Sequence, residues 1–430
     1  MTTHIETISK ETLAELLKAG IKEGSVSTSV TNFDELVFEN DSFTLLRSAD
    51  ENALNLTALN EGKKGSFSMN QLNPQGLKAA VEKTAEMAAA AKEDSAFAMA
   101  PGPKKMNFDH GPKVADREAM RDLITDFVQK TKKQYPEIGL RSVTVKFLEG
   151  RTHFENSNGV EANIRKGYYS FSALFNAQKG DNSSSMNYDG LSFTDFNLDL
   201  LSEEKFGKVF ADTIAHLDAK KYGKNHTGKA IFMPSCWNTF IQFGLAHLST
   251  GQLVAQTSRL EGKRGEKVAS PLFHLESRPQ DSLFANPNFL TSDGIETENQ
   301  VIFDQGVLKT YLLDLYGKNK LNEEKVSNFS SRLYMPKGQS SLDEMIKGID
   351  EGILIGRFSG GYPNANGDFS GIAKNSFLIK NGKIEMALSE TMISGNVFDV
   401  YEKIYATSKE VYENGTCHLP YVASDGITIS

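Results

Sequence analysis

The sequence predicts an α+β fold, in which an N-terminal α/β sandwich-like region precedes a β-rich C-terminal domain of barrel-like or sandwich form. Helical and strand-like periodicities follow one another in the first half of the chain. The second half instead holds mostly short alternating segments that turn signals separate. The chain has 430 residues, which is enough for two or three domains.

The first expected domain covers residues 1–100 and has the order α-β-β-β-α. Apolar residues recur at helical spacing over 9–22, where Ser9 can cap the helix. Three segments of alternating polarity follow and include a glycine-bounded turn at Gly62–Gly65. An alanine-rich stretch that a proline opens predicts the closing helix over 74–92.

Residues 98–112 contain three prolines and two glycines, and we interpret them as a linker. A middle α+β region over 113–220 then completes the N-terminal half. Its strands are expected to turn at Asn158–Gly159. The polar stretch 179–190 is typical of an exposed loop, and a helix is expected over 202–217.

The C-terminal domain is expected over 225–430. Two hairpins are predicted there, with turns at Gln305–Gly306 and Asn381–Gly382. The second turn is the strongest short-range signal in the chain. A two-residue type I′ turn needs positive φ at both central positions, and Asn-Gly adopts this readily.

Composition narrows the classes of function. The net charge of −8 argues against nucleic acid as a partner, because binding phosphates requires clustered Lys and Arg. Two cysteines, Cys236 and Cys417, do not make a disulfide framework. No apolar run approaches the ~20 residues of a membrane span, and the first residues do not resemble a signal peptide. We therefore expect a cytoplasmic protein with no membrane partner.

Few motifs of catalytic chemistry occur. No phosphate-binding loop with its lysine and no Gly-X-Ser-X-Gly elbow is present. The glycine-rich stretch 356–371 is read as a loop that allows close backbone approach. His247 stands out because it lies on an otherwise apolar segment, "IQFGLAHLSTG", that Pro234 should open as a helix. A lone histidine in such a setting is more often a packed side chain than a metal ligand.

Several long stretches resemble the TldD/TldE (PmbA) family, once described as modulators of DNA gyrase. They include "TSRLEGKRGEKVAS", "DGIETENQVIFDQGVLKTYLL" and "GDFSGIAKNSFLIKNGKIEMALSETMISGN", and the likeness covers nearly the whole chain. The resemblance implies two kinds of member. TldD-type chains are zinc metallopeptidases with a His-Glu-X-X-X-His helix and a distal cysteine, whereas TldE-type chains lack this motif and pair with TldD.

Placed on the family's motif, this chain is identified as a TldE-type member. The first histidine position falls on Gln242, the glutamate position on Phe243 and the second histidine position on His247. Glutamine is a poor zinc ligand and phenylalanine cannot accept a proton, so no catalytic residue and no metal are expected in this chain. His247 and Cys417 remain as weak candidate ligands, since Cys417 lies near the family's cysteine position.

The resemblance implies a non-catalytic subunit that pairs with a TldD-like catalytic subunit, whose site holds the zinc. The complex is expected to act on peptides or partly unfolded proteins. A stand-alone homodimer that binds peptides without cleaving them is the alternative. Small residues that permit close approach of an extended chain suggest a peptide groove. Its candidate residues are Gly360, Gly361, Asn364, Asn366, Gly367, Phe369 and Ser370.

Overall fold

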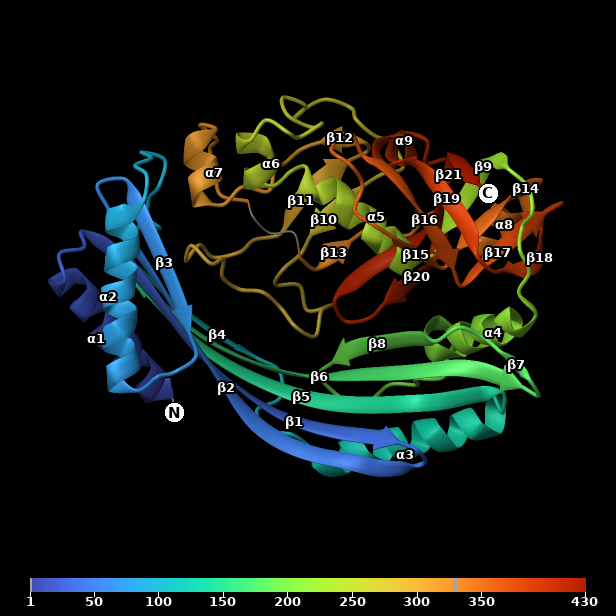
Figure 1. Cartoon of the computed structure of the whole chain (residues 1–430), viewed down its shortest axis with the longest axis horizontal. Helices are drawn as coiled ribbons and strands as arrows, with labels where there is room; N and C mark the ends of the chain where they lie inside the picture. The colour runs from blue at the N-terminus through green and yellow to red at the C-terminus, as the bar shows by residue number, and fades with distance from the viewer. Residues whose placement is uncertain (1, 328–330) are drawn as a thin grey trace.

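The computed structural model describes residues 2–327 and 331–430 and has two lobes (Figure 1). The N-terminal lobe is a long, curved sheet with helices on its convex face. The C-terminal lobe is built on a larger mixed sheet and lies over the concave face. The predicted α+β class is confirmed. Among the described residues, no helix has both the length and the apolar character needed to cross a bilayer.

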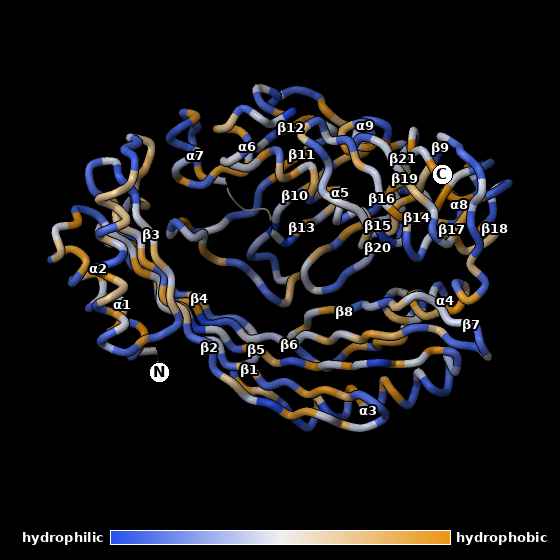
Figure 2. Tube along the Cα trace, in the orientation of Figure 1, coloured by the Kyte–Doolittle hydropathy of each residue, from blue (hydrophilic) through white to orange (hydrophobic). Residues whose placement is uncertain are grey.

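Eight strands form the N-terminal sheet, in the order β3-β2-β1-β5-β6-β4, with β7 and β8 paired to β6. They are β1 (Glu23–Glu39), β2 (Ser42–Asn60), β3 (Lys63–Met69), β4 (Lys104–His110), β5 (Ile138–Asn156), β6 (Val160–Lys179), β7 (Asn182–Ser183) and β8 (Asn187–Phe193). Hydrophobic and hydrophilic residues alternate along the long strands (Figure 2), as expected where the two faces of a sheet differ in their surroundings. The predicted turn at Asn158–Gly159 joins β5 to β6, with Gly159 at φ 82°.

The first helix lies earlier than predicted. Helix α1 spans Thr2–Lys18 rather than 9–22. Ile5 and Ile8 extend the buried stripe of Leu13 and Leu16 towards the start of the chain, so packing on β1 selects the earlier segment. Gly20, at φ 89°, follows the end of the helix.

The predicted linker is wrong. Strand β4 lies within 98–112 and pairs in parallel with β6 from Lys104 to His110. Met106 points into a buried cluster with Phe154 and Val160. The prolines and glycines flank this strand. Between them, polar and apolar residues alternate as in a strand, but the flanking residues are typical of a linker and made this alternation easy to overlook.

Two further predictions on the N-terminal lobe need correction. The predicted loop 179–190 contains β7 and the start of β8, because β6 continues far enough for a third strand to pair with it. The predicted helix over 202–217 is divided into three short elements, since Lys205 has non-helical angles. These are the π-helical turn Glu203–Gly207, α4 (Lys208–Ala215) and the 3-10 turn His216–Asp218.

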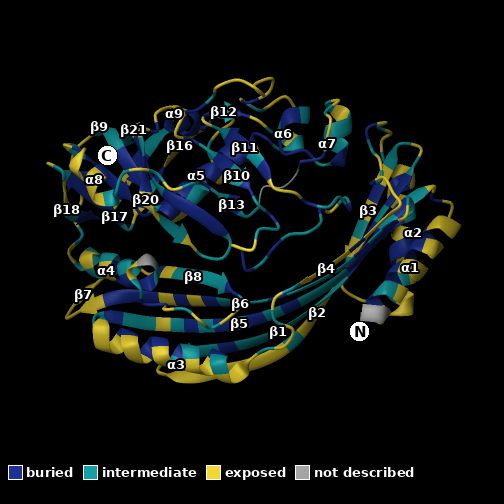
Figure 3. Ribbon diagram, turned by 180° about the vertical axis from the view of Figure 1, so that it is seen from behind, coloured by how far each residue is buried: buried dark blue, intermediate teal, exposed yellow. Residues whose placement is uncertain are grey.

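Two other helices cover the convex face: α2 (Pro74–Ala90), close to its predicted bounds, and α3 (Arg117–Gln134). Asp116 caps α3 by accepting from the amide of Ala119. The inner side of α3 buries Phe127 at 4.8 Å from the ring of Phe171, centroid to centroid, while its outer side is exposed (Figure 3). This apolar stripe anchors the helix to the sheet.

The C-terminal sheet has thirteen strands among the described residues, with the main order β12-β11-β10-β13-β21-β9-β14-β17-β18. They are β9 (His226–Phe232), β10 (Leu275–Ser277), β11 (Gln300–Asp304), β12 (Val307–Leu308), β13 (Leu333–Tyr334), β14 (Glu351–Ile355), β15 (Arg357–Gly360), β16 (Asp368–Lys374), β17 (Ser376–Lys380), β18 (Lys383–Leu388), β19 (Thr391–Asn396), β20 (Ala406–Glu413) and β21 (Cys417–Ile429). Both predicted hairpin turns are confirmed: Gln305–Gly306 joins β11 to β12, and Asn381–Gly382 joins β17 to β18, with positive φ at all four residues.

The helices of this lobe are α5 (Pro234–Ala246), α6 (Thr250–Val254), α7 (Leu315–Lys320), α8 (Leu342–Lys347) and α9 (Val397–Glu402). Helix α5 is the most deeply buried of them (Figure 3). Trp237, Phe240 and Ile241 on this helix are fully buried in the largest apolar cluster of the molecule. The helix is therefore a core element, and its last turn carries the residues that the sequence singled out.

The two lobes meet along a seam of aromatic and ionic contacts. Phe108 stacks on Phe289 with ring centroids 4.6 Å apart. Lys104 on β4 pairs with Glu296 at 2.7 Å, and near α7 Lys320 pairs with Asp94 at 2.7 Å. These contacts hold the C-terminal lobe against the concave face of the sheet.

Candidate functional site

The last turn of α5 brings together the three motif positions that the sequence identified. Gln242 is exposed, Phe243 is half-buried and His247 is buried at the C-cap. Phe240 and Ile241, just before them, point into the core and fix the orientation of the turn. Side chains at Gln242 and Phe243 must then face outward or sideways, which follows from the helical spacing.

Phe243 packs against a small group of rings. Its centroid lies 5.7 Å from Phe240, 6.1 Å from Phe358 and 5.6 Å from Tyr362. Tyr362 is 89% exposed, so the rings of Phe243 and Tyr362 extend the apolar core to the solvent-exposed surface. Phe243 is thus an aromatic side chain with aromatic partners.

His247 has a partner for its ring and for its backbone. Its Nδ1 accepts a hydrogen bond from the amide of Arg259 at 3.3 Å, and its carbonyl accepts one from Ser258 Oγ at 2.6 Å. The ring meets Phe398 edge-on at 5.0 Å. Burial, and then the nearby Arg259 guanidinium, lower the pKa of His247. The imidazole is held in the neutral form, with its proton on Nε2.

The predicted groove residues lie at the β15–β16 hairpin. Gly360 ends β15, the connection 361–367 is mostly exposed, and Ser370 is exposed on β16. Asn364 Oδ1 accepts from the amides of Asn366 at 2.9 Å and Asp368 at 3.0 Å, which holds the connection in a compact turn.

Two of the predicted groove residues face the core instead. Phe369 is buried, and its ring lies 4.8 Å from Phe240 under α5. Gly367 is also buried and has φ 88°; a Cβ there would lie 2.7 Å from the ring of Phe398. These residues fix the base of the loop, while Gly360, Gly361, Asn364, Asn366 and Ser370 present its accessible surface.

Arg259 links the histidine to this loop, and sequence reasoning missed it. Its Nη1 donates to the carbonyl of Asn366 at 2.8 Å, and its guanidinium carbon lies 5.3 Å from the ring centroid of Phe398. Asn396 Nδ2 donates to the same carbonyl at 2.9 Å. Arg259 lies within the segment "TSRLEGKRGE" that carries the resemblance, so the signal was present without an assigned role. The structure thus joins the end of α5, Arg259 and the loop 361–367 in one surface.

Cys417 lies elsewhere, at the start of β21. Its thiol lies 3.4 Å from Asn414 Oδ1, and Leu333 on β13 is its strand partner. Burial, and then the charge of Asp189, raise the pKa of the thiol to about 12. Among the described residues, the partners of Cys417 include Asn414 and Leu333, whereas those of His247 include Ser258, Arg259 and Phe398. Within residues 2–327 and 331–430, no group of three or more His, Cys, Asp or Glu is arranged to hold a metal ion.

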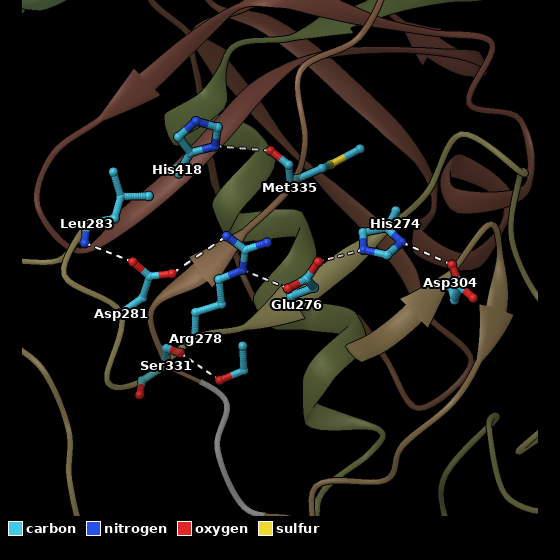
Figure 4. Close-up of polar contacts among 10 residues, drawn as sticks. His274, Glu276, Arg278, Asp281, Leu283, Asp304, Ser331, Met335 and His418 are labelled. Atoms are coloured by element: carbon cyan, nitrogen blue, oxygen red, sulfur yellow. Dashed lines mark hydrogen bonds and ion pairs between the residues drawn. The ribbon is translucent and has the colours of Figure 1, made fainter. Parts of the chain in front are cut away.

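A second polar cluster lies on β10 (Figure 4). His274 bridges Asp304 at 3.2 Å and Glu276 at 2.9 Å, and Glu276 accepts from Arg278 at 2.7 Å. The Arg278 guanidinium lies 3.5 Å above the ring of Tyr334. Each charged group in this cluster has an opposite partner, which is typical of a structural network.

Comparisons with known proteins agree with this architecture. Residues 219–430 match the family model described as PmbA/TldA metallopeptidase C-terminal domain. Metalloprotease PmbA of Escherichia coli O157:H7 is 23% identical over 409 residues, which cover 90% of this chain and 85% of that protein. A metalloprotease of Methanothermobacter thermautotrophicus is 28% identical over 184 residues, 40% of each chain. In the alignments with the first curated relatives, the chain spans less than half of their length.

A solved structure extends the likeness to the whole fold. TldE from Thermococcus kodakarensis superposes with a TM-score of 0.84, and the match covers 98% of this chain and 100% of that one at 20% identity. The likeness in fold therefore includes both lobes. Taken with the family match over the C-terminal lobe, these relationships show that the chain belongs to the TldD/TldE (PmbA) family.

Proposed function

We propose that this chain is a non-catalytic, TldE-type subunit of a TldD/TldE-like zinc metallopeptidase that acts on peptides and partly unfolded proteins. The observation that carries the proposal is Phe243. Where a TldD-type relative has its glutamate, this chain has a ring in contact with Phe358 and Tyr362. A phenyl ring cannot take the proton of a metal-bound water, a role worth ~10²–10⁴ in rate.

The donor set around α5 does not fit a zinc ion. A zinc site takes at least three protein ligands. Gln242 offers a neutral amide, Phe243 offers no donor atom, and the Nδ1 of His247 already accepts from Arg259. Cys417 lies at the start of β21, where its thiol is 3.4 Å from Asn414 Oδ1. We therefore assign no catalytic step to this chain, and the zinc of the complex would belong to the TldD-like partner.

The loop 361–367 supports a role in contacting the substrate. Tyr362 extends an exposed ring beside Phe243, and Gly360 and Gly361 leave their backbone groups accessible. Extended peptides bind such surfaces through backbone hydrogen bonds with little dependence on sequence. An aromatic side chain next to them supplies apolar contact area.

The test is to mix this chain with a TldD-like chain that carries an intact His-Glu-X-X-X-His motif and to follow hydrolysis of an unstructured peptide. Hydrolysis should require both chains and should cease when the motif glutamate of the TldD-like chain is replaced. Full turnover by the TldD-like chain alone would contradict the proposal. Peptide binding by this chain as a homodimer, with no hydrolysis in any mixture, would favour the stand-alone alternative.

The loop can be tested in the same assay. Tyr362→Ala should raise KM for the peptide by about 2- to 10-fold, the value of one aromatic contact. Val114→Ala serves as the matched control, since Val114 is 77% exposed on the N-terminal lobe. An equal effect of both substitutions would show that the loop does not contact the substrate.

A further inference from the structure

The seam between the lobes includes a place where two positive charges lie without a paired carboxylate among the described residues. At two other places on this seam a cation of one lobe meets a carboxylate of the other: Lys104 meets Glu296, and Lys320 meets Asp94. Lys166 on β6 and Arg332 before β13 have no such partner among the described residues. Each is half-buried, so neither charge is fully solvated.

Lys166 has only neutral acceptors. Its Nζ donates to Asn286 Oδ1 at 2.8 Å and to the carbonyl of Pro287 at 3.3 Å. Burial, and then the positive charge of Arg332, lower the pKa of Lys166 to about 8. Lys166 and Arg332 both bond to Asn286, which places the two cations side by side, and neither has a carboxylate partner among the described residues.

Arg332 also has only a neutral acceptor among the described residues. Its Nε donates to the carbonyl of Asn286, which leaves the two terminal nitrogens of the guanidinium without a described acceptor. Burial lowers its pKa, and only Tyr168 opposes that change. Tyr168 lies two residues beyond Lys166 on β6, so both side chains point to the same face of the strand. Its hydroxyl adds a donor on this face of the strand, within the electrostatic influence of Arg332.

Arg278, in the same region, is an arginine with a structural role and provides a comparison for Arg332. Its amide donates to the carbonyl of Arg332 at 3.0 Å, so the two residues are neighbours across β10 and β13. Arg278 pairs with Glu276 at 2.7 Å and Asp281 at 3.6 Å (Figure 4). One arginine therefore has two carboxylates and the adjacent one has none. Residues 328–330, Asn-Phe-Ser, add no charge in the sequence.

We propose that Lys166, Arg332 and Tyr168 form a binding site for the carboxylate of a peptide. An ammonium, the free edge of a guanidinium and a phenol hydroxyl match the donors that a carboxylate accepts from. A bound carboxylate relieves the repulsion between the two cations. The site lies between the lobes, because Lys166 on β6 of the N-terminal sheet and Arg332 of the C-terminal lobe both bond to Asn286. The assignment of the carboxylate to a peptide rests on the function proposed above. The site for an oxyanion does not depend on that function.

Calorimetric titration of the full chain tests this site without a partner or turnover. One probe is a short unstructured peptide with a single Glu and a free C-terminus; its match has Gln and a C-terminal amide. The carboxylate peptide should bind about tenfold or more tightly than the amide peptide at low salt. Lys166→Met and Arg332→Gln should each remove this difference, and Tyr168→Phe should reduce it.

Arg278→Gln is the matched control, and it should leave the difference intact. Near-ultraviolet circular dichroism checks that each variant is folded. If a variant of Lys166 or Arg332 does not fold, Tyr168→Phe still tests the site. Equal binding of both peptides would overturn the site. Tighter binding of inorganic phosphate than of the carboxylate peptide would overturn its assignment to peptides. Failure of hydrolysis in the two-chain assay would leave this result untouched, so the two proposals fail separately.

Discussion

The rings of Phe243 and Tyr362 lie 5.6 Å apart, and through them the end of the buried helix α5 meets the exposed hairpin loop 361–367. Arg259 makes a second connection on the same surface, from the amide that binds His247 to the carbonyl of Asn366. Phe243 thus packs between the end of a helix and a loop in this chain.

Phe243→Ala should lower the free energy of unfolding by about 1–3 kcal/mol, less than for a fully buried phenylalanine because the ring is half-exposed. Urea unfolding followed by fluorescence measures this value. Val114→Ala, at an exposed position, should stay within about 0.5 kcal/mol of the parent. A Phe243→Ala protein as stable as the parent would show that these ring contacts do not stabilise the helix end.

His247 should titrate below its ordinary pKa of 6.5, because burial and Arg259 disfavour the imidazolium. Between the lowered pKa and 6.5 the unfolded chain binds more protons than the folded chain. This group's contribution to stability is therefore complete above 6.5 and is lost as the pH falls below it. His247→Gln should remove that part of the pH dependence. NMR titration of the ring gives the pKa directly, and a value above 6.5 would contradict the assigned neutral state.

Cys417 should be nearly inert to alkylation in the folded protein. A thiol pKa of about 12 instead of 9.0 reduces the thiolate at neutral pH by roughly 10³-fold. Iodoacetamide labelling followed by mass spectrometry should modify Cys417 only after denaturation. Rapid labelling of the native chain would mean that the thiol is exposed and available as a metal ligand.

Lys166 should make stability rise with pH above neutrality. Its pKa is about 8 in the folded chain and 10.5 ordinarily, so the unfolded chain holds more protons between these values. Lys166→Met should lack this increment when urea unfolding is compared at several pH values across that window. Arg332→Gln should raise the pKa of Lys166, because it removes a like charge. If the free energy of unfolding depended on pH identically in the parent and in Lys166→Met, the inference that the two positive charges are unbalanced would be wrong.

Local features of the fold were predictable from the sequence where neighbouring residues decide the geometry. The Asn381–Gly382 turn has positive φ at both residues, as a type I′ hairpin requires. The helix that Pro234 opens was expected because apolar spacing and an N-terminal proline act within one turn. The assignment of Gln242 and Phe243 to a degenerate motif stays a prediction, which the sequence allowed because the motif consists of consecutive residues.

Only the tertiary structure decided which distant segments meet. Strand β4 forms within a stretch rich in proline and glycine because β6 offers it a parallel edge. Arg259 reaches Asn366, and Lys166 lies beside Arg332, across more than a hundred residues of chain in each case. Short-range propensities act over a few residues, whereas charge balance and shared partners depend on how two lobes pack. The sequence alone therefore determined the local elements, and the packing of the lobes determined which distant side chains meet on one surface.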